Sequence, residues 1–432
     1  MKNRKALSLI AILALVAAAC GGSDGGSDDA VVEVETTEAP ATTEAPTTTA
    51  APAPASDPLI LASLMPLSGD LASLGPGIAL GAALAVEQIN AAGGINGQPV
   101  QLIEGDSGCD GAVALTSLND VIAQGAQGVM GAACSGTSLA ILDTAIAAEV
   151  VMVSPSNTSP QFTKIDKKGF YARTAPSDLL QGDVLASLLV EDGVQTVSII
   201  SRADSYGRGL AEATAAAFEA AGGTVKTIVY HATDASEFTS EVTAVGKGGA
   251  DAIVGILFPE TGCGVLQPAF EQGLLDTPWY MTDGVKDAGL ASLCGLGTAL
   301  DGFKGTAPGS AAGEAKAAFE AAYAEVSADG SPTFIFAPQA YDAVMLMAIS
   351  AAANGVTGPE IASGLVAASS GGEKCIGVAC IALAADGVDV DYVGASGEIE
   401  LNAVGDPTAA TYDIWTTEGD TNPVLKSVDF GS

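Results

Sequence analysis

From residue 58 onward the chain alternates short apolar segments with alanine-rich stretches of helical length. Alternating strands and helices of this length predict a parallel sheet with helices on both faces. The pattern restarts after Pro176, so we expect an α/β fold with two doubly wound parallel-sheet lobes. The expected strands are 59–64, 100–104, 128–131, 150–153, 196–201, 224–230, 252–257 and 279–282, and the expected helices are 77–92, 112–124, 138–149, 179–191, 207–221, 238–247 and 264–273.

The first 57 residues do not follow this alternation. Residues 1–20 join three positive charges to an apolar stretch that is too short to span a bilayer, which predicts an export signal. The small residues that end at Cys20 resemble a bacterial lipobox, so we expect a lipoprotein signal peptide and lipidation of Cys20; ordinary cleavage is the alternative. Residues 21–57 carry eight acids and no base among Gly, Ser, Thr, Pro and Ala, which predicts a disordered acidic tether.

Charge and composition exclude several classes of function. The chain has 51 acidic and 16 basic residues and a formal net charge of −35, which repels nucleic acid. A single histidine, His231, leaves no His-rich metal site, and no nucleophile–base pair emerges. We therefore expect no enzyme, no metal and no cofactor. His231 is expected to be solvated at a strand end, whereas Trp279 is expected to pack in the core of the second lobe.

Six cysteines follow Cys20, and an even number in an exported chain favours disulfides. Sequence alone permits 15 pairings of six cysteines. Pairing each cysteine with its nearest neighbour gives three bonds, namely Cys109–Cys134, Cys263–Cys294 and Cys375–Cys380.

Polar residues gather in three loops that follow predicted strands. Residues 132–138 and 154–160 present hydroxyls and free backbone N–H groups at helix starts, which favours binding of a carboxylate. Residues 282–284 bring Asp283 to the end of a strand in the other lobe. Ligands of open α/β sheets bind beyond the carboxyl ends of strands. An anion site that faces a carboxylate suits a zwitterion, although each Ser or Thr taken alone could be an ordinary helix cap.

The sequence resembles the type I periplasmic binding proteins, and within them the branched-chain amino acid (Leu/Ile/Val) receptors of ABC transporters. The resemblance covers nearly all of residues 58–432. The stretches that carry it are Pro66-Leu67-Ser68-Gly69, residues 89–97, residues 105–110, Ser154-Pro155 with Thr158, Tyr206-Gly207-Arg208-Gly209, Phe238-Thr239 and Gly394-Ala395-Ser396-Gly397.

The resemblance implies a role for each matching residue. Ser135, Ser156 and Thr158, with Asn157 between the last two, would bind the ligand's carboxylate end, and Asp283 would bind its ammonium with a shorter side chain than the usual Glu. Tyr206 matches an aromatic residue that closes over the ligand. Phe258 and Leu74 stand where the family often has Tyr and an aromatic, so the resemblance does not give the identity of the bound side chain. The resemblance also supports the Cys109–Cys134 pair.

The resemblance further implies three crossings between the lobes, which gives the domain boundaries. Lobe 1 is expected at 58–176 and 308–393, and lobe 2 at 177–307 and 394–432. The expected function is that of a lipid-anchored, monomeric solute-binding protein on the extracytoplasmic face. It would capture an amino acid, branched-chain or otherwise apolar, by hinge closure and deliver it to the permease and ATPase of an ABC importer. The alternatives are the same fold binding an amide, urea or an aromatic acid, or a sensory lipoprotein.

Overall fold

The described part of the chain, residues 57–430 of a computed structural model, contains two large sheets. The predicted signal peptide, Cys20 and all of the tether except Asp57 lie outside the described residues. Within residues 57–430, no helix has both the length and the apolar character needed to cross a membrane.

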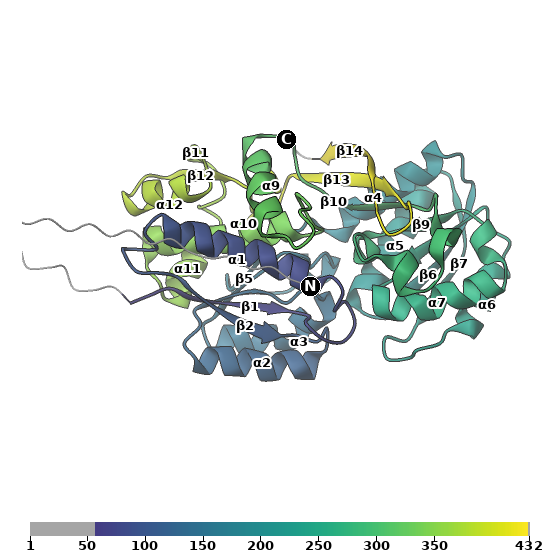
Figure 1. The fold of residues 1–432 in the computed structure, drawn as a ribbon, viewed down its shortest axis with the longest axis horizontal. Helices are drawn as coiled ribbons and strands as arrows, with labels where there is room; N and C mark the ends of the chain where they lie inside the picture. The colour runs from purple at the N-terminus through teal and green to yellow at the C-terminus, as the bar shows by residue number, and fades with distance from the viewer. Residues whose placement is uncertain (1–56, 431–432) are drawn as a thin grey trace, which may run out of the picture. The chain divides into compact units, whose positions relative to one another are not determined.

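The first sheet is parallel throughout and has the strand order β2-β1-β3-β4-β5. Its strands are joined by helices that lie along the sheet (Figure 1). The elements are β1 (Ile60–Met65), α1 (Gly75–Ala91), β2 (Gln101–Asp106), α2 (Gly111–Ala123), β3 (Gly128–Gly131), α3 (Ser135–Ala147), β4 (Val151–Ser154) and β5 (Tyr171–Arg173). Every residue of β3 and β4 is buried, as expected for strands covered on both faces.

In the second sheet, the first five strands along the chain, β6 to β10, run parallel, and one edge is antiparallel. Its order is β14-β13-β10-β9-β8-β6-β7, and β13 runs antiparallel to both β10 and β14. The prediction of a doubly wound lobe is confirmed, with this antiparallel edge as an addition. The elements are α4 (Asp178–Glu191), β6 (Thr196–Arg202), α5 (Ser205–Ala220), β7 (Thr224–His231), α6 (Thr239–Gly246), β8 (Ala252–Ile256), α7 (Pro259–Glu271), β9 (Trp279–Met281), α8 (Leu290–Leu293), β10 (Lys304–Pro308), β13 (Ala410–Thr416) and β14 (Val424–Phe430).

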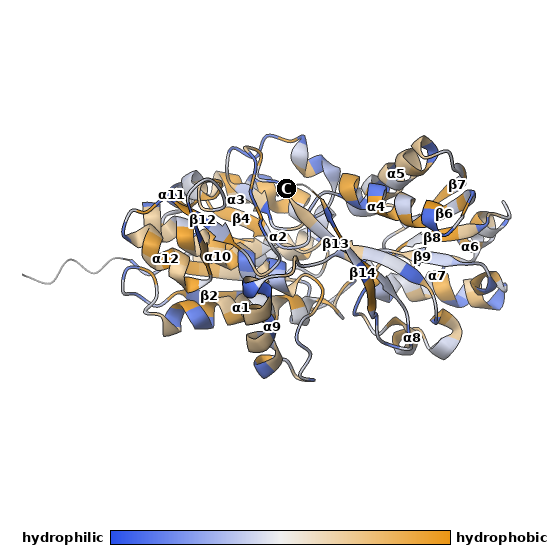
Figure 2. Ribbon diagram, turned by 90° about the horizontal axis from the view of Figure 1, so that it is seen from above, coloured by the Kyte–Doolittle hydropathy of each residue, from blue (hydrophilic) through white to orange (hydrophobic). Residues whose placement is uncertain are grey.

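Between β10 and β13 the chain returns to the first lobe. Its central helix is α10 (Ala337–Asn354), which is buried from Ala337 to Ala351 and packs against α1. Hydrophobic residues recur along the helices that cover the sheets (Figure 2). The remaining elements are α9 (Glu314–Val326), α11 (Gly358–Gly364), β11 (Glu373–Ile376), α12 (Val378–Ala385) and β12 (Val390–Val393).

The last crossing between the lobes differs from the expected position. The sequence predicts that the second part of lobe 2 starts at residue 394, but the next residues hydrogen-bond to lobe 1. Ser396 N donates to Asp342, Leu401 N donates to Ser369, and Gly405 O accepts from Arg173 N. Ala410 in β13 begins the next strand that joins the second sheet.

The three nearest-neighbour disulfides are confirmed: Cys109–Cys134, Cys263–Cys294 and Cys375–Cys380. Trp279 is buried in the core of the second lobe, as predicted. The expectation for His231 was wrong, because this residue is fully buried. Phe238 packs on its ring at 4.5 Å between centroids, and burial lowers the pKa of the imidazole.

Two of the predicted helices begin three or more residues earlier than predicted, and both shifts affect the site. Helix α3 begins at Ser135, because Cys134 before it is the N-cap residue and has an extended backbone. Helix α7 begins at Pro259, a residue suited to the first helical position, directly after Phe258. Both starts bring predicted site residues to helix N-termini.

Candidate ligand-binding site

A small cavity lies between the two lobes and is lined by residues from both. The space in it that the centre of a water-sized sphere can occupy is about 20 Å³, which is room for about one water molecule. Six of the eight predicted ligand-binding residues line it: Leu74, Ser135, Ser156, Tyr206, Phe258 and Asp283. The other lining residues are Leu71, Ile78, Ala133, Gly284 and Phe336.

The polar wall of the cavity in lobe 1 is built from the start of α3 and the loop after β4. Ser135 is the first residue of α3, where backbone N–H groups lack helical partners, and it is 2% exposed. Its hydroxyl accepts a hydrogen bond from Ser159 N at 3.4 Å, which ties the two loops together. Ser156 Oγ donates to Ala133 O at 3.2 Å. This wall presents hydroxyls and helix N–H groups, which suit an anionic group.

Asn157 and Thr158 do not line the cavity, although both are fully buried. The Asn157 side chain is already used within lobe 1: its Nδ2 donates to Ala132 O and Ala133 O, and its Oδ1 accepts from Tyr171. Asn157 therefore holds the two loops together. The Thr158 hydroxyl has no hydrogen-bond partner among the described residues.

Asp283 provides the acidic group of lobe 2. It follows β9 and is 3% exposed. Gln181 Nε2 donates to Asp283 Oδ1 at 2.8 Å and the Tyr206 hydroxyl donates to the same oxygen at 2.9 Å. Burial raises the pKa of Asp283 to about 6, although both hydrogen bonds oppose this shift. Two hydrogen-bond donors therefore stabilise the ionised carboxylate of Asp283, in a part of the cavity wall that is almost inaccessible to water.

The remaining wall is apolar and aromatic. The rings of Tyr206 and Phe258 stack with their centroids 5.3 Å apart, and the Arg202 guanidinium lies 3.9 Å from the Phe258 ring centre. Leu74 enters from the segment after β1, and Phe336 enters from the start of α10. Such walls recognise an apolar group rather than a second charge.

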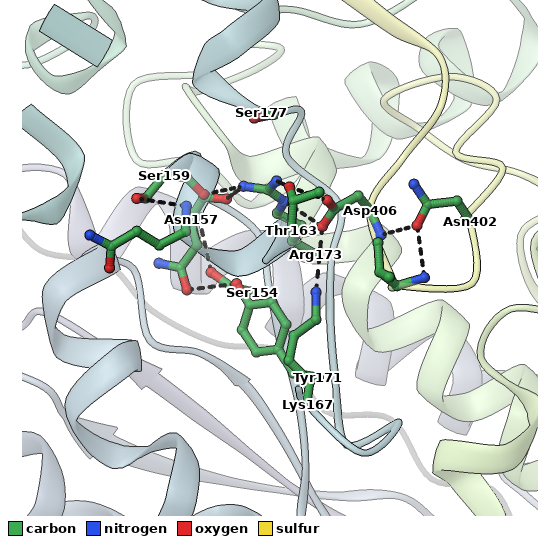
Figure 3. Close-up of polar contacts among 12 residues, drawn as sticks. Ser154, Asn157, Ser159, Thr163, Lys167, Tyr171, Arg173, Ser177, Asn402 and Asp406 are labelled. Carbon is green, nitrogen blue, oxygen red and sulfur yellow. Dashed lines mark hydrogen bonds and ion pairs between the residues drawn. The ribbon is translucent and has the colours of Figure 1, made fainter. Parts of the chain in front are cut away.

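The buried Arg173 donates hydrogen bonds to the loop that continues from the lobe 1 wall (Figure 3). Arg173 Nη1 donates to the carbonyl oxygens of Asn157 and Ser159, at 3.1 and 3.0 Å, and Arg173 Nε donates to Asp406 Oδ1 at 2.9 Å. Thr163 Oγ1 donates to the other Asp406 oxygen. Burial pushes the pKa of Asp406 upward, but Arg173, Thr163 and Lys167 together hold it below its ordinary value. The conformation of the 157–159 loop depends on this ion pair.

Direct contacts between the lobes flank the cavity. Asp70, in the segment after β1, forms an ion pair with Arg202 at the end of β6 and accepts hydrogen bonds from Thr261 N and Oγ1. Glu260 accepts from Leu71 N at 2.7 Å and Ser73 N at 2.8 Å. These contacts exist only when the lobes are together, so they stabilise the arrangement that encloses the cavity.

We expect Asp70→Ala to weaken ligand binding about 5- to 30-fold. The variant loses charge-assisted hydrogen bonds, each stabilising by about 1.5–3 kcal/mol before solvent screening, and it loses them only in the enclosed arrangement. Titration calorimetry of the wild type and variant measures the change. Asp120→Ala, which removes an exposed acid on α2, is the matched control. An affinity within twofold of the wild type would contradict this role for Asp70.

Sequence reasoning missed several residues of the site. Gln181, Ile78 and Phe336 lie within helices or at a helix start, where no local motif marks them. Asp70 could have been found, because it follows a strand in the first lobe as the other loop residues do.

A larger cavity, in which the space open to the centre of a water-sized sphere is about 420 Å³, lies elsewhere in the described fold. It is lined by the start of α9 and by residues on both sides of β13, and none of the predicted ligand-binding residues lines it. Its buried polar residues bond to one another or to the backbone: Thr174 Oγ1 donates to Gln339 O, and Gln339 Nε2 donates to Gly309 O. The smaller cavity is lined by six of the eight predicted ligand-binding residues, among them the buried Asp283, and is therefore the candidate site.

The chain is similar to known proteins. Residues 58–374 match the family model described as "Periplasmic binding protein". A "Leucine-, isoleucine-, valine-, threonine-, and alanine-binding protein" from Pseudomonas aeruginosa is 29% identical over 68% of this chain and 78% of the relative. An "Amino acid binding protein" from the same organism is 34% identical over 53% of this chain, and the match spans 62% of that relative's length.

The fold also matches solved structures. The substrate-binding protein LivJ from Streptococcus pneumoniae, solved in complex with isoleucine, superposes with a TM-score of 0.72 at 22% identity, covering 87% of this chain and 100% of that one. These relatives are binding proteins by name, in agreement with the prediction that the chain is not an enzyme. The chain therefore belongs to the periplasmic binding protein family, with the type I fold that its sequence predicts.

Proposed function

We propose that this protein is the extracytoplasmic solute-binding component of an ABC importer and that it captures a small apolar amino acid. The observation that carries the proposal is the pairing of Ser135 and Ser156 with Asp283 across one cavity. The hydroxyls and helix N–H groups of lobe 1 suit the ligand's carboxylate, and the buried Asp283 suits its ammonium. The name of the Pseudomonas relative, which includes five apolar or small amino acids, supports the same ligand class.

Binding would proceed by hinge closure. A zwitterion that contacts both lobes favours the enclosed arrangement over an open one, and the permease would then recognise the closed form. The apolar walls formed by Leu74, Phe258 and Phe336 would receive the side chain. We further propose that Cys20 carries lipid and that residues 21–57 tether the lobes to the membrane surface.

The proposal is tested by thermal-shift screening of the purified protein against amino acids, amides, urea and small carboxylates such as benzoate. A ligand that binds the native state raises the melting temperature. Apolar amino acids are expected to give the largest shifts. Shifts by benzoate or by an amide, with none from amino acids, would favour the alternative ligand classes and overturn the assignment.

The affinity for an amino acid is expected to depend on pH through Asp283. Burial raises the pKa of this carboxyl to about 6, and only its ionised form pairs with an ammonium. Affinity should therefore rise as pH increases through about 6, and fall up to about tenfold per pH unit below it, since amino acids stay zwitterionic over this range. Calorimetric titrations between about pH 4.5 and about pH 8 measure the profile. A flat profile would argue against Asp283 as the ammonium partner.

A further inference from the structure

Three groups hold the ring of Phe258 in the apolar wall of the cavity. The ring stacks on Tyr206, and it lies against Gly284, where an added Cβ would be 2.9 Å from Phe258 Cδ1. The third group is the Arg202 guanidinium, 3.9 Å from the ring centre. Phe258, Tyr206 and Gly284 line the cavity, whereas Arg202 does not. Arg202 therefore contacts the wall from outside the cavity.

Arg202 is itself held by groups from both lobes, and its side chain is only 3% exposed. Within lobe 2, its Nε donates to Asp204 Oδ2 at 2.9 Å and its Nη1 donates to Thr261 Oγ1 at 3.0 Å. Nη1 also donates to Asp70 Oδ2 of lobe 1. Bonds at Nε and Nη1 together fix the plane of the guanidinium, because its donors form a rigid fork. The ion pair between the lobes thus determines how this plane lies on the Phe258 ring.

The enclosed cavity leaves little room for a ligand. The space open to the centre of a water-sized sphere is about 20 Å³, which is room for about one water molecule. A ligand larger than water therefore needs one of the walls to move. A side chain that is packed and bonded on several sides moves at a greater cost than a loosely held one. The Phe258 ring, held on three sides, therefore limits the size of the apolar group that the cavity accepts.

We propose that Arg202 is a positioning residue that determines ligand specificity: it fixes the Phe258 ring in the enclosed arrangement, so that the cavity favours small apolar side chains over large ones. When the lobes open, Arg202 loses Asp70 and keeps its partners in lobe 2, so the ring is fully fixed only after closure. A contact between an arginine and an aromatic ring changes an equilibrium constant by about 2- to 30-fold. The inference rests on the proposed function, because it concerns the side chain of the amino acid bound at the same site.

The test measures the dissociation constants of L-leucine and L-alanine by titration calorimetry and compares their ratio between variants. Arg202→Met should lower the ratio of the L-leucine constant to the L-alanine constant about 2- to 30-fold, because the Phe258 ring then yields to the larger side chain. Arg202→Lys should lower this ratio as well, since an ammonium keeps the charge but has no plane to stack on the ring. This variant also serves if Arg202→Met fails to fold.

The matched control is Arg208→Met, which removes another arginine of lobe 2 from an aromatic ring. The Arg208 guanidinium lies 4.3 Å from the ring centre of Tyr230, and neither residue lines the cavity. Arg208→Met should leave the ratio of the two dissociation constants within about twofold of the wild-type value. A shift as large as that of Arg202→Met would mean that the loss of any such cation changes specificity, which overturns the inference.

A Phe258→Leu background shows whether Arg202 acts through the ring. In this background Arg202→Met should change the ratio of the dissociation constants by less than about twofold. An undiminished effect would mean that Arg202 acts through another group. Equal weakening of L-alanine and L-leucine by Arg202→Met in the wild-type background would mean that the residue only holds the lobes together. Either result overturns the inference.

A measurement without ligand separates this inference from the proposed function. Chemical denaturation of the wild type, Arg202→Met, Phe258→Leu and the double variant should show losses of unfolding free energy that are not additive, because the two side chains are in contact. Additive losses would overturn the inference. If the wild type bound benzoate and neither amino acid, the proposed function would be wrong, and the denaturation series would still decide whether Arg202 fixes Phe258.

Discussion

Replacing Asp283 by alanine is expected to weaken binding of an amino acid by about 2–4 kcal/mol, or about 30- to 900-fold in dissociation constant. The carboxylate lies in the cavity wall at 3% exposure, with Gln181 and Tyr206 both donating to one of its oxygens. Without it the ligand's ammonium would be buried with no counter-charge, and both donors would lose their acceptor. Titration calorimetry with the amino acid that gives the largest thermal shift measures the loss.

Two further variants make the Asp283 result specific. Asp276→Ala removes an exposed acid from the same lobe and should leave affinity unchanged. Asp283→Asn keeps the shape of the side chain but not its charge. It should therefore weaken the binding of amino acids and leave unchanged the binding of carboxylates that lack an ammonium. Unchanged affinity in Asp283→Ala would remove this residue from the site and leave the lobe 1 wall as the sole polar recognition surface of the proposal.

The fold was predictable because its signals are local. Four of the five strands of the first sheet, β1 to β4, were predicted from short apolar segments between helical stretches, whereas β5 was not predicted. The exceptions are the elements whose partners are distant. The antiparallel edge formed by β13 and β14 has no local signal of direction, and the burial of His231 depends on Phe238, which arrives from the following loop.

The site was predictable to the extent that strand ends mark it. Ser135, Ser156 and Asp283 each follow a strand, and the parallel order of the sheets brings strand ends to one edge. Supporting residues could not be found in this way. Arg173 and Asp406 are separated by 233 positions, and nothing near either residue predicts the other. Thr158 was expected to contact the ligand, but it does not line the cavity.

Replacing Arg173 by methionine is expected to lower the free energy of unfolding by about 3–5 kcal/mol, as found when one partner of a buried ion pair is removed. The substitution leaves Asp406 with the more distant Lys167, whose ammonium is 3.7 Å away, and it removes donors from two loop carbonyls. Chemical denaturation of the wild type and variant side by side measures the change. Ligand affinity should fall as well, because the hydrogen bonds from Arg173 to the carbonyls of Asn157 and Ser159 fix the loop that contributes to the lobe 1 wall.

The matched control for Arg173 is Lys304→Met, which breaks the partly exposed Lys304–Asp192 pair. Such pairs contribute about 0–1 kcal/mol, so this variant should unfold nearly as the wild type does. The comparison separates burial from charge, since both changes remove one cation from an acidic chain. If Arg173→Met were no less stable than Lys304→Met, the Asp406 network would not be what holds the 157–159 loop. The geometry of the lobe 1 wall would then have to come from the other hydrogen bonds that link the same two loops, which are made by Ser154, Ser156, Asn157 and Ser159.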